Sequence, residues 1–558
     1  QARPKLRKPA MPRSRWQNEA IVGSKREPMH VQLHAHESAA HAHAAQVLRE
    51  QPAPSRWVKP LTPARWSFKL ASSPAMAPSV RPGVGFDAAD WGDVAVPLSL
   101  ESPAAGFGQT QYTNVRYPFP LRPPHIPSEN NHVGSYQTTF EVPGEWLDRR
   151  VFLQFDGVGS AATVWIGARC PAATRPLHCP HSRRRAPDPA DGVELGYSQD
   201  WALPAEFELT HLLRGGTGGE PVDAARGHAS APHVLSVQVL RFCDGSYLEA
   251  QDQWWFSGIH RHVRLYAKPA QLSIRDYICT TSVASNGQSA ELSLEVRLDG
   301  SAVAHAAMVG SGASLAGYRI TASLHGPYVM GLGETAPEAR EVWRSEGAVT
   351  LAPDATTGGG GAVGERAEGE EGGLLAGGAV VVVDGQLEAP QLWSAEEPAL
   401  YTLLLELSGG DAKGGGGGGG GRGGGGGGGG VGEGGVVVDV EACRVGVREV
   451  GIGAGLLRVN GAPLRVCGVN RHEHSATGGK AVAWAETVRD ATLLKRFNFN
   501  AVRTSHYPNG TSWYELCDAL GLYVVDEANI ETHGFFYAPY GDEGALAKLP
   551  SWRHAFMA

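Results

Sequence analysis

The period of the hydrophobic pattern changes once along this chain, at about residue 448, and that change limits the folds available to it. Before it, from about residue 60, short segments alternate apolar and polar side chains as half-buried β-strands do. After it, apolar positions recur at helical spacing between short buried strands, which indicates parallel βα units. The 558 residues therefore predict β-sandwiches followed by an α/β unit.

Residues 59–269 predict an antiparallel sandwich of the jelly-roll type, because strand-like segments are separated by Gly and Pro clusters. Three alternating faces carry this prediction: Tyr136, Thr138 and Phe140; Val151, Leu153 and Phe155; Leu235, Val237 and Val239. Residues 167–193 break the pattern with prolines, arginines and two cysteines. We interpret them as an inserted surface loop.

Residues 270–447 predict a second, immunoglobulin-like sandwich. Its alternating faces are Leu292, Leu294, Val296 and Leu298, and then Tyr318, Ile320, Ala322 and Leu324. Gly-rich insertions lie near 355–378 and 409–435, and Gly414–Gly430 is all glycine except Arg422. Glycine loses the most backbone entropy on ordering, so this tract predicts a flexible excursion between strands. No GKS or GKT follows it, which argues against a phosphate-binding loop.

Residues 448–558 predict the opening of a βα fold. The expected elements are a strand at Leu464–Val469, a helix at Glu486–Phe497, a strand at Asn500–Arg503, a second helix and a strand at Leu522–Asp526. The first helix should bury one face, made of Val488, Ala491, Leu494 and Phe497. The second carries Trp513, Leu516, Cys517 and Leu520 at helical spacing, and Gly521 is its stop signal.

Residues 1–58 predict a partly disordered arm. Its start is basic, with no acidic residue before Glu19 and no apolar core, so it is not a secretory signal, although an organellar transit peptide stays an alternative. Five histidines follow: His30, His34, His36, His41 and His43. A His-rich tract can bind metal. No flanking cysteine or carboxylate cluster sets a geometry here, so a solvated loop is favoured.

Bulk composition excludes several classes of protein. The net charge of -8 argues against a nucleic-acid partner, which usually requires a basic face. No apolar run approaches the ~18 residues of a membrane span. Seven cysteines are scattered without CxxC spacing, which is typical of reduced thiols and favours a cytoplasmic location.

Polar, titratable residues cluster after each predicted strand of the βα segment. The clusters are Asn470, Arg471, His472, Glu473 and His474; Arg503, Ser505, His506 and Tyr507; Asp526, Glu527, Asn529, Glu531 and His533. The C-terminal strand ends form the active face of a βα barrel, so these clusters predict one polar site. Glu531 and His533 are two apart and can meet one cation, and a carboxylate with waters suits Mg²⁺. His472 and His474 lack the i, i+4 spacing of helical zinc ligands.

Long motifs in this segment carry a family resemblance. GVNRHEH (Gly468–His474), FNAVRTSHYPN (Phe499–Asn509) and GLYVVDEANIETHG (Gly521–Gly534) resemble the large, multi-domain retaining β-galactosidases of glycoside hydrolase family 2, which also holds β-glucuronidases and β-mannosidases. Four earlier motifs resemble the first two domains of those enzymes: YTNVRYPFP (Tyr112–Pro120), GYSQDWALPAEFELT (Gly196–Thr210), DGSYLEAQDQWWFSGIHRHV (Asp244–Val263) and LWSAEEPALY (Leu392–Tyr401).

The resemblance implies a TIM (β/α)8 barrel and hydrolysis of terminal β-galactosides such as lactose, in a homo-oligomer. It implies that Asn114 and Asp252 reach the galactosyl hydroxyls, with Asp252 also holding Na⁺. His472 and His506 would hydrogen-bond the sugar and stabilise its transition state. Glu531 and His533 would be two ligands of an active-site Mg²⁺.

The chain also departs from the family pattern. A retaining glycosidase needs two carboxyl groups ~5–5.5 Å apart, and the family places both beyond the NIETHG motif. After Gly534 only Asp542 and Glu543 occur, in a GDEG loop. We therefore expect this chain alone to be inactive, with an incomplete barrel whose open sheet edge makes it unstable. A non-catalytic galactoside-binding or complementing fragment is one alternative, and β-glucuronidase or β-mannosidase specificity is another.

Overall fold

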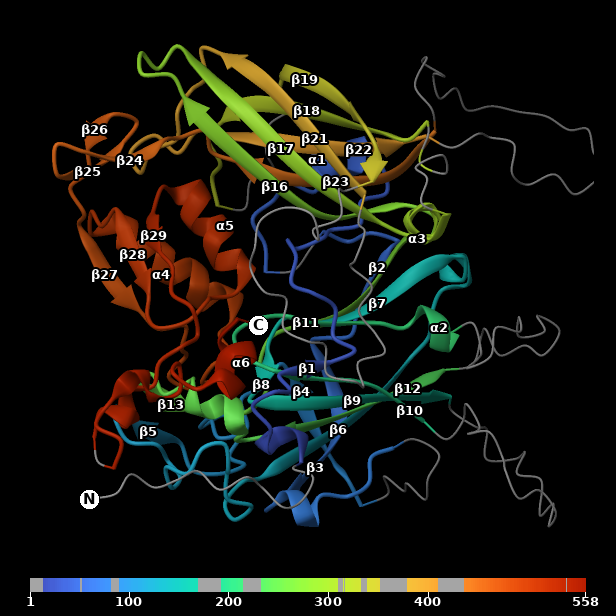
Figure 1. Ribbon diagram of the computed structural model, residues 1–558, viewed down its shortest axis with the longest axis vertical. Coiled ribbons are helices and arrows are strands. Elements are labelled where there is room, and N and C mark those ends of the chain that lie inside the picture. Colours follow the sequence, from blue (N-terminus) through green and yellow to red (C-terminus); the bar gives the residue numbers. More distant parts are fainter. Residues whose placement is uncertain are drawn as a thin grey trace, which may run out of the picture.

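A computed structural model describes residues 14–50, 53–81, 90–168, 192–213, 232–309, 315, 317–332, 339–351, 379–409, 436–537 and 539–557. Two β-sandwich units lie at opposite ends of the view in Figure 1, and a smaller α/β unit lies beside them. The basic start, most of the predicted inserted loop and almost all of both Gly-rich insertions lie outside the described residues.

The first unit is a sandwich of two antiparallel sheets. The larger has the order β1 (Gly23–Ser24), β10 (Val193–Gln199), β9 (Ala161–Ala168), β12 (His233–Leu240), β6 (Val133–Phe140), β3 (Ala64–Ala71), β4 (Gly92–Val96). The smaller has the order β11 (Ala205–Glu208), β7 (Arg149–Phe155), β15 (Val263–Pro269), β2 (Val58–Pro60). The predicted faces on β7 and β12 are buried in the core between the sheets, which confirms them.

Two short strand pairs extend from this sandwich. β5 (Gln111–Thr113) pairs with β13 (Gln253–Trp255), and β8 (Val158–Gly159) pairs with β14 (Gly258–Ile259). Asn114 directly follows β5, and Asp252 directly precedes β13.

The second unit is also a two-sheet antiparallel sandwich. One sheet has the order β16 (Ser273–Val283), β17 (Ser289–Asp299), β21 (Ala379–Glu388), β20 (Thr350–Leu351), and the other β19 (Glu341–Ala348), β18 (Arg319–Tyr328), β22 (Leu400–Ser408), β23 (Val437–Val445). Alternate residues of β17 and β18 fill the core, as the pattern predicts. Helix α3 (Ser301–Val309) follows β17.

The third unit begins with an antiparallel sheet of β24 (Val450–Gly453), β25 (Leu456–Val459) and β26 (Ala462–Pro463). The parallel strands β27 (Gly468–Arg471), β28 (Ala501–Thr504) and β29 (Tyr523–Val525) follow. They alternate with α4 (Trp484–Arg496) and α5 (Thr511–Leu520). Gly521 ends α5 at φ +73°, a conformation that favours glycine. The predicted fold class, two β-sandwiches and a parallel βα unit, is confirmed.

Two local predictions in this unit are wrong. The strand expected at Leu464–Val469 lies at Gly468–Arg471. The Asn500 side chain accepts from the Cys467 amide and donates to the Arg465 carbonyl, so a side chain binds the backbone there in place of a neighbouring strand. Phe497 was expected on the buried face of the helix, but it is 72% exposed because α4 ends just before it.

The histidine-rich arm is packed between the three units, which corrects the expected solvated loop. Leu33 and Ala35 join the core of the second unit, and Leu48 joins that of the third. A short helix, α1 (Ala39–Ala44), lies against β22 and β23, and the amides of residues 34 and 35 donate to the buried Glu441. The arm is held by these long-range contacts, which local sequence does not encode.

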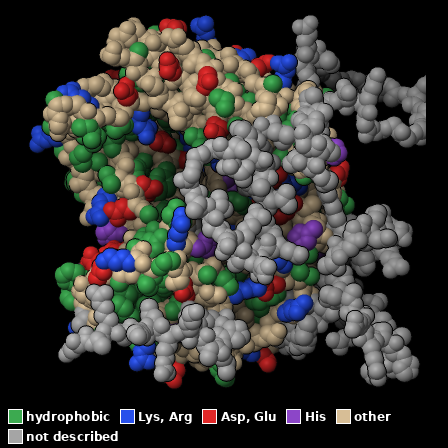
Figure 2. Space-filling view, viewed as in Figure 1, with side chains coloured by type: hydrophobic (Ala, Val, Ile, Leu, Met, Phe, Trp, Pro, Cys, Tyr) green, Lys and Arg blue, Asp and Glu red, His purple; other side chains and the backbone are tan. Residues whose placement is uncertain are grey.

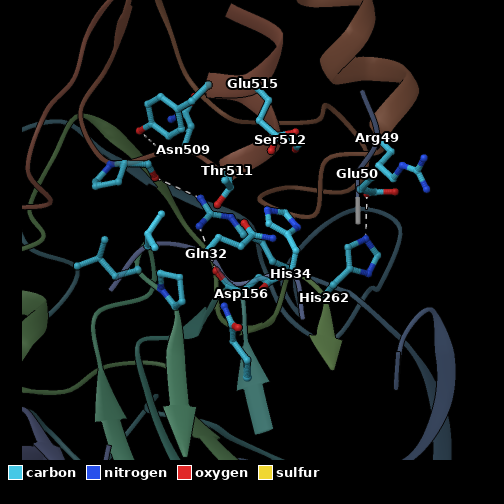
Figure 3. A pocket seen from close by; sticks show the side chains of 18 of the residues that line it. Gln32, His34, Arg49, Glu50, Asp156, His262, Asn509, Thr511, Ser512 and Glu515 are labelled. Atoms are coloured by element: carbon cyan, nitrogen blue, oxygen red, sulfur yellow. Dashed lines mark hydrogen bonds and ion pairs between the residues drawn. The ribbon is translucent and has the colours of Figure 1, made fainter. Parts of the chain in front are cut away.

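A cavity of about 910 Å³ lies where the arm meets the three units (Figure 3). Gln32 and His34 of the arm project into it beside Asp156 of the first unit and Thr511 of α5. Its lining includes Glu473 and Asp526 of the strand-end clusters but neither His472 nor His506. No helix in the described ranges is long and apolar enough to cross a membrane.

Candidate active site

The ends of the three parallel strands bring the predicted polar clusters together. Arg503, in β28, donates to Glu527 beyond β29. His506 Nδ1 lies 2.9 Å from the other oxygen of the same carboxylate. Thr504 Oγ1 donates to Asp526 Oδ1 at 2.8 Å. The three strands run parallel, so their carboxyl ends meet at one edge of the sheet and bring these side chains together.

His472 and His506 come from different strands and face each other. Their ring centroids are 5.6 Å apart and nearly perpendicular, at 82°. His472 Nδ1 lies 3.2 Å from the phenol oxygen of Tyr507. Burial and the neighbouring His506 lower the pKa of His472, so this ring is neutral at neutral pH. The structure thus brings together the two histidines to which the resemblance assigns a role toward the sugar.

The first unit supplies the remaining predicted sugar contacts. Asn114 Nδ2 donates to Asp252 Oδ2 at 3.2 Å, and the Tyr112 hydroxyl donates to the other carboxylate oxygen. The charge of Asp252 acts on the barrel side as well. After burial, it is one of the influences that raise the pKa of Glu531, and it opposes the lowering of the His472 pKa. Asp252 therefore acts electrostatically on His472 and Glu531, which lie about 220 and 280 positions away in the sequence.

Glu531 and His533 lie side by side, with Oε1 and Nδ1 3.4 Å apart. Burial raises the pKa of Glu531. Backbone pairing with the first unit holds this segment: the Glu531 amide donates to the Leu248 carbonyl, and the Ala250 amide donates to the Glu531 carbonyl at 3.0 Å. Across the described residues, no three His, Cys, Asp or Glu side chains are grouped to hold a metal ion. The Glu531 carboxylate is a ligand of the kind that a hydrated Mg²⁺ accepts, and His533 lies beside it.

Other members of the strand-end clusters face away from the site. Glu473 accepts from Arg261 of the first unit and from the Gly510 amide, and it is 8% exposed. His474 stacks between Trp254 and Phe256. Both residues connect the third unit to the first and have no part in a metal site with His472.

Sequence reasoning missed the residues that join the units behind the site. Arg261 donates to Glu473 at 2.5 Å and to the Pro508 carbonyl at 3.2 Å. Lys480 lies 3.0 Å from the Trp201 ring centroid, and Trp201 packs on Tyr507 at 4.5 Å. The motifs that contain Arg261, Trp201 and Tyr507 were recognised, whereas Lys480 lies outside them, and contacts over more than 200 positions leave no periodic or spacing signal.

Three family models match the chain. One describes the family 2 glycosyl hydrolase sugar binding domain and matches residues 61–176 and 190–269. A second, described as glycosyl hydrolases family 2, matches residues 346–414. A third describes the TIM barrel domain of the same family and matches residues 450–557. The three matches follow the order of the three units.

Curated relatives give the same family. A β-galactosidase of Psychromonas ingrahamii is 32% identical over 542 residues, which are 97% of this chain and 41% of that protein. A β-galactosidase of Enterobacter cloacae is 34% identical over 540 residues, 96% of this chain and 41% of that protein. The chain thus spans about two fifths of the length of these relatives.

Solved structures share the fold at lower identity. A Bifidobacterium dentium β-glucuronidase with bound coumarin-3-O-glucuronide superposes with a TM-score of 0.53 at 20% identity, covering 87% of this chain and 63% of that one. A Bacteroides uniformis β-glucuronidase gives a TM-score of 0.54 at 17% identity, covering 85% and 42%. With its three units matched in order by models of one family, this chain belongs to family 2 of the glycosyl hydrolases.

Proposed function

We propose that the chain is part of a β-galactosidase that hydrolyses terminal β-D-galactosides with retention. The observation that carries the proposal is the convergence of Asp252 from the first unit with His472, His506 and Glu531 from the third. Relatives named β-galactosidase at 32–34% identity support it. The β-glucuronidase structures support the fold alone, because their identity to this chain is too low to carry specificity.

The negative charge of the site favours an uncharged sugar as the ligand. Asp252, Glu527 and Glu531 are grouped there, and the nearby Arg503 is already paired with Glu527. A glucuronide would bring a further carboxylate among these acidic groups, and like charges repel strongly where water is partly excluded. A galactoside adds only hydroxyl groups, which the carboxylates and imidazoles can bind.

Each residue then has a distinct role in the proposed reaction. Asp252, held by Asn114 and Tyr112, accepts from sugar hydroxyls. His472 and His506 hydrogen-bond the sugar more strongly as it distorts toward an oxocarbenium ion, which lowers the barrier. Glu531 and His533 would hold Mg²⁺, and Asp252 would contribute to a Na⁺ site. Bound Mg²⁺ would supply positive charge that orders the acidic side chains around the sugar.

The carboxylates described around the histidines are all engaged. Glu527 is bound by Arg503 and His506, Asp252 by Tyr112 and Asn114, and Glu531 faces His533. We assign none of them as nucleophile or general acid, since each already has a binding role in the proposed site. We therefore expect the 558-residue protein to bind galactosides without hydrolysing them.

Two measurements test the proposal. The 558-residue protein should bind methyl β-D-galactoside more tightly than methyl β-D-glucuronide in calorimetric titrations, and Asp252→Ala should abolish the preference. A longer product of the same gene should cleave aryl β-galactosides faster than aryl β-glucuronides or β-mannosides. Equal binding of both sugars, or faster cleavage of glucuronides, would refute the proposed specificity. Turnover by the 558-residue protein above a buffer blank would refute its expected inactivity.

A further inference from the structure

Tyr507 is buried beside His472: it is 2% exposed, and the two ring centroids are 5.9 Å apart. Its ring packs against Trp201 of the first unit, at 4.5 Å between centroids. Its amide donates to the Thr504 carbonyl at 3.0 Å. The phenol is therefore held from two sides, and its oxygen lies 3.2 Å from His472 Nδ1.

The hydrogen atoms of this contact can be assigned by counting donors and acceptors. Burial raises the pKa of the Tyr507 phenol and outweighs the lowering of that pKa by the nearby Glu473 backbone, so the hydroxyl keeps its proton. That proton needs an acceptor, because an unpaired buried hydroxyl is costly. The acceptor that the structure provides is His472 Nδ1.

An Nδ1 atom that accepts a hydrogen bond carries no proton. In a neutral imidazole the proton is then on Nε2. His472 is exposed on its other side, and its Nε2 makes no hydrogen bond to the described part of the chain. The ring thus presents one N–H group toward the open site.

We infer that Tyr507 is a positioning residue that holds His472 in the Nε2–H tautomer, so that His472 donates a hydrogen bond to a hydroxyl oxygen of the bound sugar. The hydrogen bond from Tyr507 to His472 rests on the contacts of these two residues. That the acceptor is a sugar hydroxyl rests on the proposed function.

His506 carries its proton on the other ring nitrogen, Nδ1. His506 Nδ1 lies 2.9 Å from Glu527 Oε2 and 3.3 Å from Arg503 Nη2. We assign the proton of this nitrogen from the shorter contact, because a carboxylate can only accept. In the neutral ring, His506 Nε2 is then a bare acceptor. One donor and one acceptor on rings 5.6 Å apart match hydroxyl groups, which both donate and accept.

The tautomer can be read from nitrogen-15 chemical shifts of histidine side chains, which separate protonated from bare ring nitrogens. The 558-residue protein would be labelled at its histidines, and the His472 signals assigned by their loss in His472→Gln. At pH 8 we expect His472 to show a protonated Nε2 and a bare Nδ1. A His472 protonated on Nδ1 in the unaltered protein would overturn the inference, and this result needs no variant to fold.

Tyr507→Phe removes only the hydroxyl and keeps the ring against Trp201. We expect its His472 signals to move to a mixture of both tautomers, and its affinity for methyl β-D-galactoside to fall about fivefold, as for one ordinary hydrogen bond. Tyr514→Phe is the matched control, since the Tyr514 hydroxyl contacts Asp526 and the Asn509 amide instead of a histidine. It should leave the His472 signals unchanged. An unchanged tautomer in Tyr507→Phe would also overturn the inference.

The two proposals fail in different ways. In one outcome His472 shows the expected tautomer, Tyr507→Phe shifts it to a mixture, and no galactoside binds. The positioning role then holds and the proposed function fails. If galactosides bind and the tautomer is unaffected by Tyr507→Phe, the proposed function stands and the positioning role fails.

Discussion

The first sandwich and the parallel unit bury their strands to very different extents. In β7 the last five residues, Val151–Phe155, are all buried between two facing sheets. In β27 and β29, the outer strands, only Arg471 is buried and Val525 is 54% exposed, whereas three of the four residues of the central strand β28 are buried. Helices α4 and α5 cover one face of the parallel sheet, whereas the described residues leave the other face open. Figure 2 shows hydrophobic side chains at the left edge of the view, over this unit.

The parallel unit therefore depends on its neighbours for much of its order. Trp393 of the second unit donates to the Asp518 carbonyl at 2.7 Å and packs on Tyr523. Arg261 of the first unit binds Glu473. The site residues of the third unit therefore lie on a unit that is held by contacts from both sandwiches.

Truncation of the sandwich core should have the largest effect. Phe155→Ala removes a fully buried ring and should cost about 4 kcal/mol, whereas Val525→Ala at the open face should cost well under about 1 kcal/mol. Hydrogen exchange of the β7 amides measures the loss of stability in Phe155→Ala, and exchange of the β29 amides measures the loss in Val525→Ala. Equal losses at the two positions would contradict the contrast between the units.

Acid should weaken the contact between the first unit, the arm and the second unit. Burial alone would raise the pKa of Glu206, but Arg275 and His30 outweigh it and lower the pKa to about 2. A lowered folded-state pKa stabilises the protein fully above the unfolded value of 4.5, and this contribution of about 3 kcal/mol is lost as the pH falls toward 2.

Urea unfolding between pH 2.5 and 5.5 measures this loss, and Glu206→Gln should flatten the pH dependence. Glu346→Gln is the control, because Glu346 is half exposed in its ion pair with Arg319. Parallel curves for Glu206→Gln and the unaltered protein would show that this carboxylate is not the acid-sensitive group.

A moderate effect is expected at the junction between the first and third units. Arg261→Lys keeps the charge beside Glu473 but loses the fork that also reaches the Pro508 and Ala202 carbonyls. The loss should be about 1–2 kcal/mol, seen as faster hydrogen exchange at Gly510 without a change in β7. An equal increase in hydrogen exchange at Gly510 and in β7 would mean that the two units unfold together.

The smallest effect is expected at the surface of the third unit. Lys548 and Asp542 form an ion pair with side chains 69% and 40% exposed. Solvent screens such pairs, so Lys548→Ala should leave the melting temperature unchanged within error. A shift as large as that of Arg261→Lys would mean that surface charge contributes to the order of the open unit.

Particular elements show how far sequence reasoning reaches. The faces of β7, β12, β17 and β18 were predictable because a period of two depends only on neighbouring residues. The Gly521 stop signal was predictable for the same reason. The position of β27 was not, since the Asn500 side chain, 33 residues away, binds the backbone of the segment just before it. The packed arm was missed because its partners lie in all three units.

The sequence by itself determined the two β-sandwiches, the parallel βα unit and the strand-end clusters that contain His472, His506, Glu531 and His533, because periodicity and motifs are local properties. Only the tertiary structure decided that Asp252 lies near these residues, that Glu473 turns away to Arg261, and that Tyr507 supports His472. Those outcomes depend on how three separately folded surfaces meet, and side chains hundreds of residues apart carry no local signal of their contact.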